Sequence, residues 1–384
     1  MDDFREAYHR ELALALDITD GVTDGEDQLP EGWALRKPVA AETPGMTRLL
    51  AAHQERVLGT SRAAWMDVDD KVLGRGAEFR FHRIAKDADG EIRGWVSVAD
   101  RAVHRVLVDI HLDPAVVAGE LPGVDAAALW QALMAWGRGA AQRVAQRRGV
   151  SSAVLDSSPY AEDPFTLGML ERAGFHKART WWQMRRPVAP EEADPEVLGP
   201  PKEGLVVRMV DQNTSGRLPN EEDLRAVHAA LEDAFQDHFD SHPEPFLEFV
   251  SRLREDRAHR WDHWWLAELA EDGTIAGAVI SAAILDDGDL QEQLRRAEEG
   301  LQQEVPTAIG TYIEYIGVTR AARGRGAAKG LLHAVIRDAA ERGREFVDLE
   351  VDADSPTGAQ EIYSSMGWRT KYVTETWHAT LTVD

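Results

Sequence analysis

Two stretches of the chain repeat the same order of apolar and polar segments. Each begins with a short apolar segment that ends in arginine, at 33–36 and at 206–208. Each continues with two alternating segments joined by an Asp-Gly pair, Asp89-Gly90 and Asp272-Gly273. Apolar alternation on both sides of Asp-Gly is typical of β-hairpins. The pattern therefore predicts strands at 79–85, 94–98, 264–269 and 277–281.

The two stretches also end alike. In each, an apolar strand and an acidic loop precede a helix that stops at a glycine and an aromatic residue, Gly174-Phe175 and Gly367-Trp368. A glycine at this place suits a left-handed helix cap. Trp-containing strands follow at 180–184 and 373–377. The shared order predicts a tandem duplication of α/β (α+β) domains, each with a mixed, mostly antiparallel sheet flanked by helices.

A stretch rich in proline and acidic residues separates the two halves. Because proline disfavours helix interiors and sheet pairing, we interpret this stretch as a linker. Only the second half contains a polar, helix-like insertion, at 286–305. Two interpretations of this insertion remain: a lid over a site, or a segment that simply extends into solvent. The predicted organisation is an N-terminal helix and acidic loop (1–31), a first domain (32–186), the linker (187–204) and a second domain (205–384).

Composition narrows the classes of function. The chain has 384 residues, a formal net charge of −24 and no cysteine. It therefore has no disulfide, thiol nucleophile or Cys-ligated zinc. The acidity argues against nucleic-acid binding and favours a cationic partner. We see no membrane or export segment and expect a cytoplasmic protein, monomeric or homodimeric.

The sharpest local feature is a small-residue loop between a strand and a helix. The apolar segment 311–318 precedes Arg323–Lys329, and an amphipathic helix follows to about Glu341. Glycines let a backbone approach a ligand closely, and helix N-termini favour anions. The loop therefore suits a pyrophosphate. A dinucleotide-binding motif would need glycine where Lys329 stands, and a Walker A motif is absent. The structural alternative to an anion site is that the loop is only the solvent-exposed, basic start of a helix.

Two motifs carry a resemblance to a known family. Arg323-Gly-Arg-Gly-Ala-Ala328 satisfies the [Q/R]-x-x-G-x-[G/A] signature of the GCN5-related N-acetyltransferases (GNAT superfamily), and 351–368 resembles that family's second motif, with Trp368 in place of phenylalanine. The duplicated layout is similar in architecture to tandem GNAT proteins of the mycothiol synthase type. The resemblance implies acetyl-CoA, or another acyl-CoA, as cosubstrate, and no metal.

The resemblance also implies site residues in the second half. The glycine loop would hold the pyrophosphate of the cosubstrate, and the end of the preceding strand would contact its pantetheine arm. The implied cofactor-binding residues are Val318, Arg323, Gly324, Arg325, Gly326, Ala327, Ala328 and Lys329. Glu314 is the candidate general base, because strand alternation places it on one face with Tyr312, Ile316 and Val318. Tyr363, the tyrosine of the second motif, is the candidate acid for the leaving thiolate.

The acceptor side and the first half complete the hypothesis. We expect Phe235, His238 and Phe239 to line the substrate site. Counting back from Leu112 and Gly174 places Val108 and Leu170 where Glu314 and Tyr363 stand, so we expect no chemistry in the first half. We predict acyl transfer, most simply acetyl transfer, to a primary amine of a small molecule by direct attack in a ternary complex. The alternatives are a noncatalytic acyl-CoA-binding sensor or partner module, and an NAD-dependent enzyme.

Overall fold

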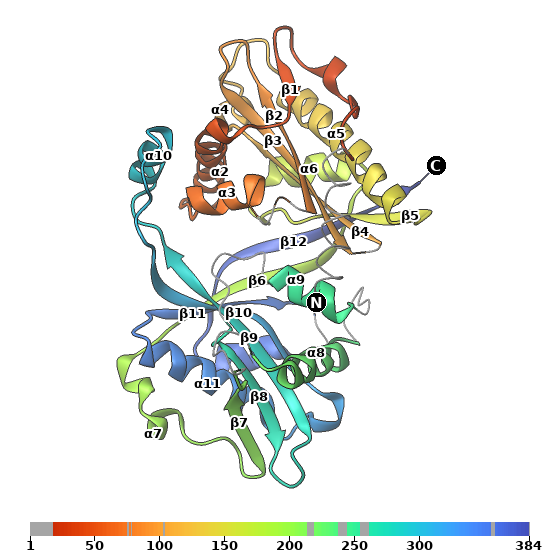
Figure 1. The fold of residues 1–384 in the computed structure, drawn as a ribbon. Coiled ribbons are helices and arrows are strands. Elements are labelled where there is room, and N and C mark those ends of the chain that lie inside the picture. Colours follow the sequence, from red (N-terminus) through yellow and green to blue (C-terminus); the bar gives the residue numbers. More distant parts are fainter. Residues whose placement is uncertain are drawn as a thin grey trace. The chain divides into compact units, whose positions relative to one another are not determined.

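The computed structural model describes residues 18–74, 77, 79–102, 104–212, 219–236, 244–253, 261–354 and 358–383. The chain divides into two compact units, each with its own set of strands and helices (Figure 1). Unit 1 consists of Met1–Thr180, Gly288–Glu304 and Val373–Asp384, and unit 2 of Trp181–Asp287 and Val305–Tyr372. Within the described ranges, no helix has both the length and the apolar character needed to cross a membrane.

The sheet of unit 1 has the strand order β1-β2-β3-β4-β5-β12. Among the described residues, all its pairings are antiparallel except that of β4 with β5. Its strands are β1 (Ala34–Arg36), β2 (Arg80–Lys86), β3 (Ile92–Ala102), β4 (Arg105–Leu112), β5 (Ser152–Ser157) and the part of β12 (Arg369–Thr382) from Val373 onward. Its helices are α2 (Thr43–Leu58), α3 (Trp65–Leu73), α4 (Pro114–Val117), α5 (Ala126–Arg147), α6 (Pro164–Arg172) and α10 (Leu290–Glu298), with short 3-10 turns at Glu26–Gln28 and Ala40–Glu42.

The sheet of unit 2 has the corresponding order β7-β8-β9-β10-β11-β6. Again a single pairing, that of β10 with β11, is parallel among those described. Its strands are β7 (Leu205–Met209), β8 (Trp264–Leu269), β9 (Ile275–Asp286), β10 (Thr307–Val318), β11 (Phe346–Asp352) and the part of β6 (His176–Pro187) from Trp181 onward. Its helices are α7 (Pro195–Leu198), α8 (Glu221–Phe235), α9 (Phe246–Leu253), α11 (Ala327–Glu341) and α12 (Ala359–Ser365), with 3-10 turns at Pro190–Ala193 and Arg320–Ala322.

Helices cover both faces of the unit 2 sheet. On one face the apolar side of α11, with Leu331 and Val335, packs on Val347 and Leu349 of β11. On the other face α8 and α9 pack against β8 and β9 around Trp264. Strand alternation sends neighbouring residues to these two cores, as period two requires. The predicted fold class, mixed and mostly antiparallel sheets flanked by helices, is confirmed.

The compact units do not coincide with the predicted domains. The end of the first half, Trp181–Pro187, pairs along its length with β11 and belongs to unit 2. The end of the chain pairs with β5, from Trp377↔Ser157 to Thr382↔Ser152, and belongs to unit 1. Each half of the sequence therefore supplies the last strand of the other half's sheet. Local sequence patterns cannot show this exchange, because the sheet with which a strand pairs is decided by contacts far apart in the sequence.

The predicted linker is ordered within unit 2. Pro190 and Pro195 occupy first-turn positions of short helical segments, where a missing N–H has no cost. Arg186 forms an ion pair with Glu192, whose carboxylate also accepts the backbone N–H of Ala189 at 2.9 Å. The N–H of Val188 bonds to the carbonyl of Glu345 at 2.8 Å. The stretch thus packs against the edge of the unit rather than forming a free connection.

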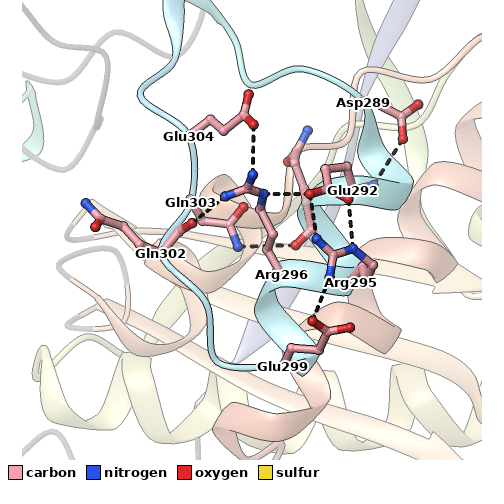
Figure 2. A network of polar contacts seen from close by, with 9 residues as sticks. Asp289, Glu292, Arg295, Arg296, Glu299, Gln302, Gln303 and Glu304 are labelled. Carbon is pink, nitrogen blue, oxygen red and sulfur yellow. Dashed lines mark hydrogen bonds and ion pairs between the residues drawn. The ribbon is translucent and has the colours of Figure 1, made fainter.

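The predicted insertion forms α10 and belongs to unit 1. Its arginines bond to acids of the same segment, with Arg295 between Glu292 and Glu299 (Figure 2). The side chain of Gln293 accepts the backbone N–H of Trp65 at 3.0 Å, and Glu298 forms an ion pair with Arg48 of α2. Within unit 1, α10 is therefore a docked helix and not a solvated excursion.

Candidate active site

The glycine loop has the backbone geometry that the sequence predicts. Gly324 and Gly326 have φ of 78° and 96°, in the left-handed region that favours glycine. Gly326 is the N-cap of α11, and no side chain caps this helix end. A helix leaves its first N–H groups without intrahelical partners and carries partial positive charge there. The loop and the start of α11 can therefore hold an anion on Ala327, Ala328 and Lys329.

The arginines of the loop already have acidic or carbonyl partners. Asp233 of α8 accepts the backbone N–H of Arg320 at 2.7 Å and forms an ion pair with its guanidinium at 3.1 Å. Arg325 forms an ion pair with Glu271 at 3.2 Å. Arg323 donates to the carbonyl of Ala234 at 3.4 Å. These contacts fix the loop against α8 and the β8–β9 turn and leave the backbone N–H groups at the start of α11 as the main donors that an anion would meet.

A basic residue from the predicted linker lies over the loop. A Cβ added to Gly326 would stand 3.2 Å from Cδ of Lys202. Lys202 thus adds a cation to the site that sequence reasoning missed. No local signal could have found it, because a lysine in a proline-rich stretch looks like any solvated charge.

The strands that flank the loop separate beside it. The parallel pairing of β10 with β11 runs from Gly310↔Phe346 to Ile313↔Leu349 and ends there. β10 continues along β9 to Val318, the residue that precedes the loop region, and β11 continues to Asp352. Because α11 and α12 follow these two strands, the loop, Val318 and the second motif meet at one edge of unit 2. An extended substrate arm can lie along the end of β10.

Glu314 is the extra residue of a β-bulge. Ile313 pairs with Ser281 and Tyr315 with Ile280, so two steps along β10 match one step along β9. The extra residue reverses the alternation beyond it. Ile316 and Val318 join Ile313 in the core under α11, whereas Tyr315 packs in the core under α8. The prediction of one face shared by Glu314, Tyr312, Ile316 and Val318 assumed a regular strand and is wrong for Ile316 and Val318, which lie on the face of Ile313.

A cluster of tyrosines and carboxylates surrounds the bulge. Burial raises the pKa of Tyr312 well above its usual value, and the neighbouring Glu350, Tyr372, Glu314 and Tyr315 raise it further. Glu350 is exposed by surface area, yet the neighbouring atoms of the sheet partly desolvate its carboxyl and raise its pKa, and it accepts a hydrogen bond from Gln183. The carboxylates of Glu314 and Glu350 therefore both act electrostatically on the phenol of Tyr312. Sequence reasoning did not find Glu350, which lies on another strand and in no motif.

One predicted substrate residue reaches this cluster. Phe235, the last residue of α8, lies edge-on to Tyr315 with ring centroids 6.4 Å apart. His238 and Phe239, the other two predicted substrate residues, lie outside the described residues. An aromatic wall therefore stands next to the bulge on the α8 side.

Tyr363 lies in α12 and is nearly enclosed. Its ring packs edge-on to Trp368 with centroids 5.9 Å apart, and both residues belong to the core under α11. Burial raises the pKa of Tyr363 to about 12. The phenol is therefore protonated at neutral pH and can donate a hydrogen bond, but it releases its proton less readily than an exposed tyrosine.

The first half lacks the bulge but keeps the helix cap. Leu112↔Gly94 and Val108↔Val98 of β4 and β3 lie on a continuous register. Val108 therefore corresponds to Ile313, and Glu314 has no counterpart, which corrects the count that equated Val108 with Glu314. At the other motif, Phe175 donates to the carbonyl of Leu170 at 3.0 Å as Trp368 does to that of Tyr363 at 3.1 Å. The predicted equivalence of these helix ends is confirmed.

No group of three or more His, Asp or Glu side chains is placed to hold a metal ion in the described part of the chain. Residues 228–368 match the model of the acetyltransferase (GNAT) family. This segment contains Phe235, the bulge, the glycine loop and the second motif. A search of curated proteins finds no significant match.

Several solved structures resemble almost the whole chain. A GCN5-related N-acetyltransferase from Sphaerobacter thermophilus has a TM-score of 0.68 at 24% identity, covering 92% of this chain and 97% of that one. A tandem GNAT protein from the clavulanic acid biosynthesis pathway has a TM-score of 0.59 at 12% identity, covering 92% and 99%. A glucosamine N-acetyltransferase region of a fungal multi-domain protein has a TM-score of 0.57 at 14% identity, covering 91% and 38%. At these identities the likeness establishes the tandem fold.

Proposed function

We propose that this protein, whose residues 228–368 match the model of the acetyltransferase (GNAT) family, transfers an acetyl group from acetyl-CoA to the primary amine of a small molecule. The observation that carries the proposal is the place of the Glu314 bulge. It stands on the strand that separates from β11 and leads into the uncapped, glycine-rich start of α11. A carboxylate, an anion site and an extended strand edge thus lie along one short piece of chain.

The pyrophosphate of the cosubstrate would bind the amides at the start of α11. Gly326, Ala327, Ala328 and Lys329 would supply these N–H groups, whereas the N–H of Arg325, a residue that the resemblance also implied, bonds to the carbonyl of Ala322 at 3.3 Å. Gly324, whose added Cβ would meet nothing within 4 Å, leaves room for a close approach. Backbone amides at a helix N-terminus are well suited to phosphate. Lys202 and Lys329 add charge, while Arg323 and Arg325 mainly hold the loop in place. The pantetheine arm would then follow β10 at Val318.

Glu314 would accept the proton of the attacking amine. An ammonium has no lone pair, so the acceptor must lose a proton before or while its nitrogen forms a bond to the thioester carbonyl. Glu314 is the extra residue of the bulge, and its carboxylate acts electrostatically on the phenol of Tyr312. Collapse of the tetrahedral species then breaks the C–S bond and releases CoA thiolate. The chain contains no cysteine to form an acyl-enzyme, which favours direct attack.

Tyr363 would stabilise the departing sulfur chiefly as a hydrogen-bond donor. With a pKa of about 12, its phenol is a weaker acid than a thiol, whose ordinary value is about 8.5. Complete proton transfer to the thiolate is therefore unfavourable, whereas donation of a hydrogen bond to developing negative charge is not. The proton that finally neutralises the thiolate can come from solvent.

The acceptor is proposed to be a small amine that is cationic in solution. Glu314 and Glu350 lie near one phenol, and the rings of Phe235 and Tyr315 form an aromatic wall beside them. Carboxylates and aromatic faces both attract ammonium groups. The net charge of −24 acts in the same direction at longer range.

A thiol-release assay tests the proposal. Acetyl-CoA is mixed with the protein and a panel of primary amines, and free CoA is detected with a thiol reagent. Because the protein has no cysteine, it adds no background to this signal. Amine-dependent release supports the proposal. Binding of acetyl-CoA without release for any amine would support a noncatalytic acyl-CoA-binding module instead.

A further inference from the structure

Unit 1 contains a small pocket, with several titratable side chains in its lining, at the place where its own parallel strands separate. The pairing of β4 with β5 ends at Leu107↔Asp156, and the pocket opens beyond that point with a cavity volume of about 40 Å³. That space holds a few non-hydrogen atoms, the size of one functional group. Its lining includes His53, Asp109, His111, Trp130, Tyr160 and Asp163. The expectation of no chemistry in the first half leaves this concentration of polar groups unexplained.

Two uncharged imidazoles stand at the pocket. The rings of His53 and His111 meet edge-to-face with centroids 5.1 Å apart. Burial lowers the pKa of His53 to about 3 and that of His111 to about 4, so both are neutral at pH 7. Nδ1 of each ring is buried and has no hydrogen-bond partner within the described ranges. Nε2 of His53 lies 3.7 Å from Asp163, which favours the Nε2–H tautomer and leaves Nδ1 as an acceptor.

Two aspartates line the pocket, and they differ in how their charge is balanced. Asp163 is neutralised by Arg56 at 2.9 Å and accepts the hydroxyl of Thr166 at 2.6 Å. Asp109 accepts the backbone N–H of Ser158, and its burial raises its pKa although Arg80 and Lys71 act in the opposite direction. A cation in the pocket would offset the cost of charging this carboxyl. An anion would meet Asp109 and two imidazoles that resist protonation.

We propose that this pocket binds the ammonium group of a small primary amine, as a second site separate from the acyl-transfer site of unit 2. An ammonium donates three hydrogen bonds, which matches the carboxylate of Asp109 and the one acceptor nitrogen that each neutral imidazole, His53 and His111, carries. The short alkyl part of the ligand would lie on Trp130 and Met134, which also line the pocket. Because both Nδ1 atoms are enclosed, binding requires the two rings to rearrange.

Ring-nitrogen NMR of the whole protein tests this site directly. The imidazole signals of His53 and His111 are assigned with His53→Gln and His111→Gln, and methylammonium is titrated at constant ionic strength. The proposal predicts saturable shifts of both rings. Tetramethylammonium, which carries the charge but no N–H, and acetate should leave them unchanged. Absence of shifts with methylammonium, or equal shifts with tetramethylammonium, would overturn the proposal.

A second test of the pocket removes the charge of Asp109. Asp109→Asn should weaken methylammonium binding at least tenfold, whereas Asp89→Asn, the same change in the exposed turn before β3, should leave it unaltered. The measurements are repeated in Glu314→Gln, which keeps this pocket intact and separates it from the proposed acceptor site. If acetyl-CoA shifts the two rings and methylammonium does not, the pocket serves another ligand and the proposal is wrong. The wild-type titration decides the matter even if Asp109→Asn does not fold.

Discussion

Ile313 and Tyr315 of β10 pair with adjacent residues of β9, although Glu314 stands between them. A bulge of this kind aims one side chain away from the regular pleat and is frequent beside active sites. The corresponding strand of unit 1 runs past Val108 without it. The bulge therefore distinguishes the unit that we propose to be catalytic from its structural relative.

Replacing Glu314 by glutamine keeps the shape of the bulge and removes the base. We expect Glu314→Gln to lower kcat by about 10²–10⁴-fold near neutral pH, the usual contribution of a general base, with little change in acetyl-CoA affinity. Steady-state kinetics and calorimetric titration of the cosubstrate measure the two quantities. Glu341→Gln, the same change at the exposed end of α11, is the matched control. A wild-type kcat in Glu314→Gln would remove this residue from the mechanism.

The strand exchange and the bulge mark the limits of what the sequence predicts. Individual strands, both hairpins, the glycine loop and the two glycine-capped helices follow from local patterns, because turn and cap residues such as Gly90, Gly273, Gly174 and Gly367 determine them locally. Which sheet receives β6 or β12 depends on long-range pairing, which no local pattern encodes.

The sequence predicts those residues of the candidate site that lie within contiguous motifs. The loop residues and Tyr363 come from motifs, and Glu314 from being a lone acid in an apolar strand. Its orientation was not predictable, because an inserted residue is visible only when the partner strand is known. Lys202 and Glu350 come from other segments and meet the site only in three dimensions.

Gly326 offers a test of the anion site with an internal control. An alanine at φ of 96° is strained by roughly 1–2 kcal/mol, and it also places a methyl group in the loop beside Lys202. Gly343 has φ of 70° at the other end of α11, with nothing within 4 Å of an added Cβ. Both alanine variants should lose similar stability in urea. We expect the dissociation constant of CoA to rise at least tenfold in Gly326→Ala alone; equal binding in both would contradict the anion site.

Tyr363→Phe removes the phenol and leaves the packing on Trp368. We expect kcat to fall by about tenfold or more while acetyl-CoA still binds, because only the leaving sulfur loses a hydrogen bond. Since burial raises the pKa of Tyr363 to about 12, its proton stays in place up to about pH 11. The pH–rate profile of the wild type should therefore show no decrease in rate below pH 10 that depends on Tyr363. Any decrease in that range should also occur in Tyr363→Phe. If a decrease disappears in Tyr363→Phe, the phenol titrates as a true acid in the complex.

His82 predicts how unit 1 responds to acid. Its Nδ1 accepts the indole N–H of Trp95 at 3.2 Å and its Nε2 faces the carbonyl of Lys71 at 3.1 Å, and burial lowers its pKa to about 4. The unfolded chain takes up a proton near pH 6.5, which the folded protein resists. Stability is therefore lost as the pH falls from 6.5 through about 4, by roughly 2 kcal/mol at pH 4.5.

Urea unfolding at pH 7 and pH 4.5 checks this prediction. His82→Gln, which retains a donor and an acceptor, should lose less stability between the two values than the wild type. His104→Gln, at an exposed position before β4, should follow the wild type. An unchanged pH response in His82→Gln would mean that the acid sensitivity arises elsewhere.

The most direct test of the acyl-transfer account is the fate of the acetyl group. The protein is incubated with acetyl-CoA and an amine that stimulates CoA release, and the amine is analysed by mass spectrometry beside a Glu314→Gln sample. The account predicts one acetyl group on the amine for each CoA released, and strongly reduced formation of both products in the variant. CoA release without acetylated amine, or equal acetylation by the variant, would contradict it.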